Sequence, residues 1–155
     1  QIHPYQQNIF YPHDRLSKLT GNLTRKESFA EIICPMISAE AWNKCGNELL
    51  DNRFFYGWGL DYDISYQLHK NGFRTYITDK VGVYHSAFTS YKNKEKTKEN
   101  LNKDEFVLKA RNNMYEILSD KYGKDWMNLI VNTIPEDVPP HALISWLEAN
   151  DDFRR

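Results

Sequence analysis

The ten residues from Phe54 to Asp63 constrain this chain most, because an apolar helix pattern precedes them and another follows. They include two glycines, five aromatic residues and two acids. Glycine adopts backbone conformations that other residues resist, and aromatic side chains offer flat contact surfaces. An acid at the head of a helix is stabilised by the free backbone N–H groups there. The stretch therefore predicts a binding loop that runs into a helix, with a carboxylate at the junction.

A helix is expected on each side of this loop. The first spans Ala39 to Leu50 and begins after Ser38, a good N-cap residue. Its apolar face is expected to contain Trp42, Cys45, Leu49 and Leu50. The second is a short helix that begins at Asp61 and ends at the Asn71-Gly72 turn. Its residues Gln67, His69 and Lys70 are expected to face solvent.

Strands are expected around this pair of helices. Phe29 to Cys34 has the pattern of a buried strand that Pro35 interrupts, and Phe73 to Thr78 alternates as a strand does. Val81 to His85 is expected to form a further strand, and residues 1–28 extended chain with short strands. The order strand, helix, loop, helix, strand, strand predicts an α/β core.

Three regions are expected along the chain. Residues 1–91 form the body, the lysine-rich stretch 92–102 is a polar linker or surface loop, and residues 103–155 form a helical C-terminal extension. The extension is expected to pack on the core or to serve as an assembly surface. Its predicted helices are Lys103 to Lys121, Trp126 to Ile134 and Ala142 to Ala149.

Composition narrows the classes of function. The chain has 155 residues, 41% of them hydrophobic, and no run long enough to cross a membrane. A formal net charge of −1 gives no electrostatic reason to expect nucleic acid or an anionic membrane as partner. The two cysteines favour free thiols in a reducing, cytoplasmic compartment over a disulfide framework. Because the sequence starts at Gln1, we expect it to be a piece of a longer protein.

Asp61 and Asp63 are the sharpest candidates for chemistry. Two carboxylates beside a glycine–tryptophan loop can act as general base and partner, or can bind a metal. They can equally be an N-cap and a first-turn acid that only favour the helix dipole. The Gly-Trp-Gly sequence before Asp61 favours the functional interpretation.

Trp58 is a candidate stacking surface for a ligand, or a core residue that fixes the loop. His85 is a candidate metal ligand or acid–base group, or a partly buried histidine bonded to a carbonyl.

These residues resemble the second half of glycosyltransferases with the A-type fold. The resemblance rests on Gly57 to Ile64, Leu68, Lys70 to Arg74, and Val83 to His85. In such enzymes a glycine–tryptophan loop leads into an acidic cluster and a short helix, and two strands then end in a histidine. The resemblance implies that Asp61 is the base of an inverting transfer, and that His85 helps to hold Mn²⁺ or Mg²⁺ on a nucleotide diphosphate. It also implies an acceptor cleft shaped by Tyr56, Gly57, Trp58 and Gly59.

A second resemblance covers roughly Phe29 to His85. Phe29-Ala30-Glu31-Ile32, Pro35, Ser38, Ala41-Trp42 and Gly57 to Asp61 are similar to an uncharacterised, glycosyltransferase-like family of plants and microbes. The sequence departs from the full enzyme pattern in two ways. No Asp-x-Asp metal motif precedes Phe29, and Leu60 stands where many relatives have a glutamate. The resemblance therefore implies an acceptor-side half whose donor-binding half lies in a missing N-terminal part or a partner subunit.

Three functions follow as hypotheses. The first is a glycosyltransferase part that moves a sugar from a nucleotide sugar to a hydroxyl acceptor, with Asp61 as base. The second is a non-catalytic carbohydrate-binding or assembly module on the same half-fold. The third is a structural helical partner domain based on residues 103–149, for which the loop at Trp58 is incidental.

Overall fold

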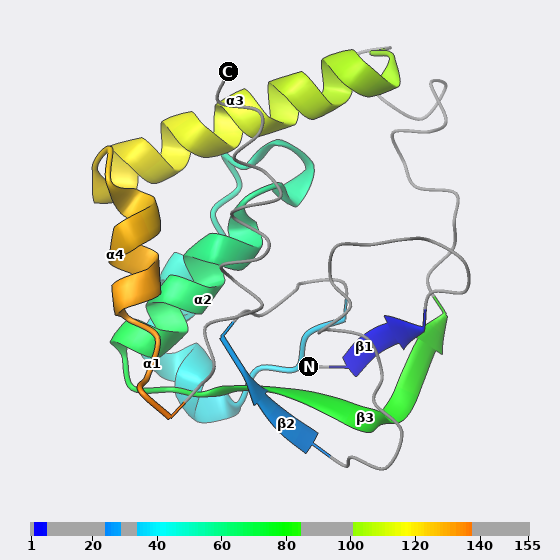
Figure 1. Cartoon of the computed structure of the whole chain (residues 1–155), viewed down its shortest axis with the longest axis vertical. Helices are drawn as coiled ribbons and strands as arrows, with labels where there is room; N and C mark the ends of the chain where they lie inside the picture. The colour runs from blue at the N-terminus through cyan, green and yellow to red at the C-terminus, as the bar shows by residue number, and fades with distance from the viewer. Residues whose placement is uncertain (1, 6–23, 29–33, 85–100, 138–155) are drawn as a thin grey trace.

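The computed structural model describes residues 2–5, 24–28, 34–84 and 101–137. These residues form four α-helices, one short 3-10 helix and a three-stranded sheet (Figure 1). Helix α3 runs across one end of the molecule, α2 lies beneath it, and the sheet lies at the opposite end (Figure 1). The predicted mixed α/β class is confirmed. The strand predicted at Phe29–Cys34 and the helix predicted at Ala142–Ala149 lie outside the described residues, apart from Cys34.

The sheet is built around one long central strand. β1 (Ile2–Tyr5) and β2 (Thr24–Glu27) flank β3 (Thr75–Tyr84) in the order β1-β3-β2. β2 pairs antiparallel with the start of β3, where Glu27 is opposite Thr75, and β1 pairs parallel with it as far as Tyr84. The prediction of separate strands at 73–78 and 81–85 was therefore wrong. β2 pairs with residues 75–78 and β1 with Thr78, Val83 and Tyr84, so β3 is one strand whose register against β1 shifts between Thr78 and Val83.

Helix α1 (Ala39–Leu49) confirms the first predicted helix and its cap. The Ser38 hydroxyl oxygen accepts a hydrogen bond of 3.2 Å from the backbone nitrogen of Ala41. The buried side chains are Ala41, Cys45 and Leu49. Trp42 and Leu50, which were predicted to share this face, are 45% and 61% exposed. The buried positions recur every four residues, so Trp42 lies about 100° further round the helix than Ala41, whereas Leu50 follows the last helical residue and has a non-helical backbone.

Helix α2 (Leu60–Lys70) confirms the second predicted helix, but all its residues from Tyr62 to His69 are buried. The prediction that Gln67 and His69 face solvent was wrong, since they are only 3% and 5% exposed. Gln67 Nε2 donates to the Tyr122 hydroxyl at 2.7 Å, and His69 Nε2 lies 2.9 Å from the Ser28 carbonyl oxygen. These hydrogen bonds to distant residues satisfy one polar atom of each side chain in the core, while Gln67 Oε1 and His69 Nδ1 have no hydrogen-bond partner among the described residues.

The C-terminal helices pack against α2 in one apolar core. α3 (Lys103–Tyr122) begins with a capping box formed by Asn102 and Glu105, and α4 (Trp126–Asn132) follows it. The sequence pattern predicts an apolar face of Phe106, Val107, Ala110, Met114, Ile117 and Leu118 on α3, and all of these are buried except Val107, which is partly exposed. The core also includes Tyr62, Ile77 and Trp126. The helices of the predicted extension thus share a core with α2 and β3.

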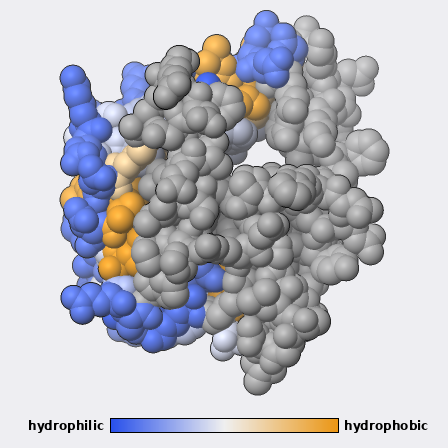
Figure 2. Space-filling model, viewed as in Figure 1, coloured by the Kyte–Doolittle hydropathy of each residue, from blue (hydrophilic) through white to orange (hydrophobic). Residues whose placement is uncertain are grey.

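The surface of the described residues is mainly hydrophilic on the face shown in Figure 2. A band of hydrophobic atoms is visible on the side where α4 lies (Figures 1 and 2). Leu129 of α4 is 37% exposed. None of the helices in these ranges is long and apolar enough to span a bilayer.

Candidate functional site

The residues between α1 and α2 form a tight turn of unusual backbone conformation. We call Phe54–Gly59 the aromatic turn; its centre is the 3-10 helix η1 (Phe55–Gly57). Tyr56 has φ 51° and ψ 26°, while Gly57 and Gly59 have φ angles of 79° and 94°. Positive φ suits glycine and is uncommon for a bulky side chain. The positive φ angles thus explain why glycine occupies positions 57 and 59, the two positions predicted to shape a binding loop.

Helix α3 holds the aromatic turn in place. The Asn113 side-chain oxygen accepts a hydrogen bond of 2.6 Å from the backbone nitrogen of Phe55. Gly59, the N-cap residue of α2, packs so closely on α3 that an added Cβ would overlap the Met114 side chain. Phe54 is buried in the same core as Met114. The turn is therefore a rigid element fixed between α2 and α3.

Aromatic rings cluster around the N-terminal half of α3. The Phe106 ring centroid lies 5.2 Å from that of Phe55, 5.1 Å from that of Tyr56 and 6.4 Å from that of Trp58. These separations and tilted orientations are those that aromatic pairs prefer. Tyr56 is 45% exposed, and Trp58 is partly buried. Trp58 packs on the buried Phe106 ring and is partly exposed, so it helps to fix the turn, and its role as a stacking surface for a ligand stays a prediction.

Asp61 lies in the first turn of α2, immediately after the aromatic turn. Its residue is partly exposed, and its Oδ1 accepts a hydrogen bond of 3.2 Å from the backbone nitrogen of Tyr62. Its backbone carbonyl accepts from the Ser65 hydroxyl at 2.7 Å. A carboxylate at this end of a helix is stabilised as an anion by the helix dipole. Asp61 is thus an accessible carboxylate on a fixed backbone, next to an aromatic surface.

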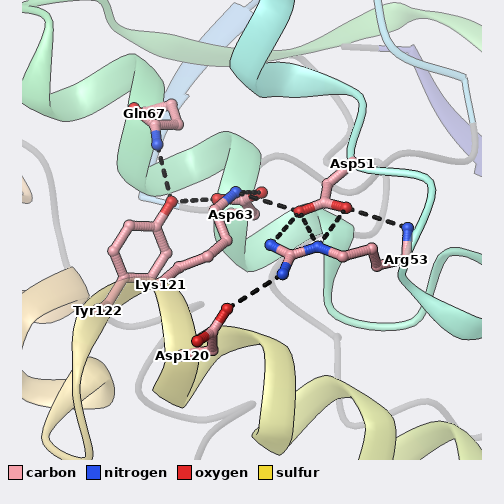
Figure 3. A network of polar contacts seen from close by, with 7 residues as sticks. All are labelled: Asp51, Arg53, Asp63, Gln67, Asp120, Lys121 and Tyr122. Carbon is pink, nitrogen blue, oxygen red and sulfur yellow. Dashed lines mark hydrogen bonds and ion pairs between the residues drawn. The ribbon is translucent and has the colours of Figure 1, made fainter.

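Asp63 has a different environment from Asp61. Its side chain is fully buried, and its two oxygens accept from the Lys121 ammonium and from the Tyr122 hydroxyl (Figure 3). Both donors come from the end of α3, so Asp63 joins α2 to α3. A buried carboxylate with its oxygens already occupied does not meet a substrate. This geometry assigns Asp63 a structural role in place of the catalytic one predicted beside Asp61.

A chain of charges continues from Asp63 to the surface (Figure 3). Lys121 Nζ lies 3.6 Å from Asp51 Oδ2, and Arg53 Nη2 lies 2.8 Å from the same oxygen. Arg53 also reaches Asp120 at 3.1 Å. The hydrogen bonds from the Arg53 guanidinium lower the pKa of Asp51 to about 2. Burial, together with the hydrogen bond to Asp63, raises the pKa of Tyr122 well above its usual range, so its hydroxyl stays protonated as a donor.

The proposed metal ligand His85 lies outside the described residues. Within the described ranges, no three His, Cys, Asp or Glu side chains are grouped closely enough to hold a metal ion.

Sequence reasoning identified the aromatic turn but missed the residues of α3 that hold it. Asn113, Lys121 and Tyr122 carry no motif, and each contacts a residue 58 or 59 positions earlier in the chain. The nearest available signal was the helical period of α3, which places residues 106, 110, 113, 114, 117 and 121 on one side of the helix. That period predicts a packed face without saying what the face packs against.

These features define a mixed α/β domain in which an aromatic turn and a helix-terminal carboxylate are held by a C-terminal helix. A family model described as a protein of unknown function, DUF707, matches residues 17–127, and the chain belongs to that family. The matched region includes the aromatic turn, α2 and nearly all of the helices that hold them. No curated protein and no solved structure matches the chain.

Proposed function

We propose that this chain is the acceptor-side part of an inverting glycosyltransferase with the A-type fold. The observation that carries the proposal is that a partly exposed carboxylate, Asp61 in the first turn of α2, lies five residues after the exposed ring of Tyr56 in the aromatic turn. A sugar ring presents an apolar face that lies on aromatic side chains, and its hydroxyl groups need a base close by. The resemblance of Gly57–Ile64 to such enzymes supports the same function.

In this proposal Tyr56 and Trp58 bind the acceptor, and Gly57 and Gly59 let the backbone approach it. Asp61 accepts the proton from the acceptor hydroxyl as that oxygen attacks the anomeric carbon of the donor. The hydrogen bond from the backbone of Tyr62 keeps the carboxylate oriented. Asp63, with Lys121 and Tyr122, holds the helix that carries Asp61 and takes no part in proton transfer. Binding of Mn²⁺ or Mg²⁺ with His85 would neutralise the leaving diphosphate.

The test is nucleoside diphosphate release by the full-length protein from a panel of nucleotide sugars, with sugar alcohols and glycosides as acceptors. Asp61→Asn should lower turnover by at least about 10²-fold, the usual contribution of a general base. Asp120→Asn is a matched control, because that carboxylate is 70% exposed and lies on the far end of α3. Unchanged turnover in Asp61→Asn would remove Asp61 from the mechanism.

A non-catalytic carbohydrate-binding module is the second candidate. The exposed Tyr56 ring supports it, since stacking on a sugar requires no base. This candidate predicts sugar binding that Asp61→Asn leaves intact and that Tyr56→Ala weakens, with no nucleoside diphosphate release from any donor. Metal-dependent binding of a nucleoside diphosphate would favour the enzyme instead.

A further inference from the structure

A cavity of about 320 Å³ opens between α1, α2 and the start of β3. It shares no lining residue with the aromatic turn. Its lining is mainly apolar and includes Ile37, Ala41, Ile64, Leu68 and Phe73. The volume lies within the range of roughly 300–1,000 Å³ that small-molecule sites occupy. The described residues therefore contain a hollow of ligand size that the proposed function does not use.

The cavity lies beside the small core cluster that joins α1 to α2. Ala41, Cys45 and Leu49 of α1 form this cluster with Ile64 and Leu68 of α2. Of the three α1 residues only Ala41, with its short side chain, also lines the cavity, and the chain continues along the cavity wall through Ser38. The apolar side chains that line the cavity favour contact with an apolar group of a ligand.

One side of the cavity is polar and favours an anion. Arg74 lines it, and Arg74 Nε lies 3.3 Å from Asp137 Oδ1. Asp137 also pairs with Lys26, so a single carboxylate serves two cations. The N-terminus of the 11-residue helix α1 opens onto the same cavity at Ser38, and helix N-termini attract negative charge. The exposed carboxylate of Glu40 opposes this field, but it does not line the cavity.

We propose that this cavity binds a small amphipathic anion. Its apolar body would lie against Ile64 and Leu68, and its carboxylate or phosphate end would lie between Arg74 and the start of α1. Because the walls come from two helices and a strand, the site suits a compact molecule better than an extended peptide. The proposal is independent of sugar transfer, and it holds or fails whether or not Asp61 is a base.

Decanoate and decyl phosphate are suitable probes, and decanol and decyltrimethylammonium are the matched neutral and cationic controls. Titration of the full chain, followed by methyl NMR, should shift the methyl signals of Ile37, Ile64 and Leu68. Both anions should bind more tightly than the controls, and the tighter of the two identifies the head group. The proposal is overturned if these methyl signals do not move, or if decanol binds as tightly as the anions.

Two variants separate the polar and apolar halves of the site. Arg74→Gln should weaken decanoate binding by roughly tenfold, because it removes one charge-assisted contact. Lys26→Gln is the matched control, since it removes the other cation paired with Asp137 but does not line the cavity. Ala41→Leu should fill the cavity and abolish binding. Equal weakening by Arg74→Gln and Lys26→Gln, or full binding by a folded Ala41→Leu, would contradict the assignment.

Discussion

The side-chain oxygen of Asn113 in α3 accepts a hydrogen bond of 2.6 Å from the backbone nitrogen of Phe55, 58 residues earlier. This bond joins the aromatic turn to a helix that sequence patterns place in a separate C-terminal extension. The candidate site is therefore built from both parts of the chain, and removing α3 would remove the support of the turn.

Asn113→Leu is expected to lower the free energy of unfolding by about 1–2 kcal/mol, because the Phe55 amide is left without its acceptor in a partly buried place. Asn113→Asp keeps an acceptor oxygen and should lose less. Urea unfolding measures both. Asn112→Leu is the control, since Asn112 is exposed on the same helix, and an equal loss there would refute the role of the hydrogen bond.

Gly59→Ala is expected to destabilise the protein for two reasons that a matched variant separates. A φ of 94° costs about 1–2 kcal/mol for an L-residue, and the new methyl group would overlap Met114. Gly72→Ala has the same kind of strain at φ 83°, with no atom within 4 Å of the added carbon. The thermal midpoint should therefore fall further for Gly59→Ala than for Gly72→Ala. Similar midpoints would mean that α3 does not press on the turn.

Removing one partner of the Asp63–Lys121 pair should cost about 3 kcal/mol or more, because the remaining charge keeps little access to water. Lys121 is 18% exposed and Asp63 is fully buried. The Lys26–Asp137 pair is a contrast, because both side chains are more than 40% exposed and water screens the two charges, so its loss should cost much less than the loss of the Asp63–Lys121 pair. A double-mutant cycle with Asp63→Asn and Lys121→Met measures the coupling. A coupling near zero would show that the two residues do not depend on each other.

Stability should fall as the pH drops below about 6.5, the pKa of a histidine in an unfolded chain. Burial lowers the pKa of His69 in the folded state, so below that pH the unfolded chain binds more protons than the folded one. His69→Gln should flatten the curve of unfolding free energy between about pH 7 and 5. Asp51→Asn should leave that window unchanged. The contribution of Asp51 to the unfolding free energy should be lost as the pH falls from about 4 to 2, because the hydrogen bonds from Arg53 lower the pKa of Asp51 to about 2 in the folded state.

The helices were largely predictable because each contains its own signals. Ser38 caps α1, and the period of Phe106, Ala110 and Met114 marks the buried face of α3. These signals lie within one turn or a few turns of the residues that they organise. The length of β3 was not predictable in the same way, since it depends on pairing with both β1 and β2.

The different burial of Asp61 and Asp63 also could not be predicted from the sequence. Both are acids in the first turn of one helix, two positions apart. Lys121 and Tyr122 donate hydrogen bonds to Asp63, which is buried and joins α2 to α3. Asp61 stays partly exposed. The burial of His69 has the same kind of cause, because its partner Ser28 is 41 residues away. The spacing of hydrophobic residues along the sequence does not predict such contacts between distant residues.

The unusual backbone conformation of Tyr56 coincides with an exposed aromatic ring on the surface of the turn. A φ of 51° is favourable for glycine or asparagine, and a residue with a large side chain at that φ has about 1–3 kcal/mol of backbone strain. Asparagine at this position would relieve the backbone strain, but it would also remove the contacts of the Tyr56 ring with Phe55 and Phe106 and the most exposed ring of the turn. Backbone conformation and ring packing therefore favour different side chains at position 56, and tyrosine combines a strained backbone with an exposed aromatic surface.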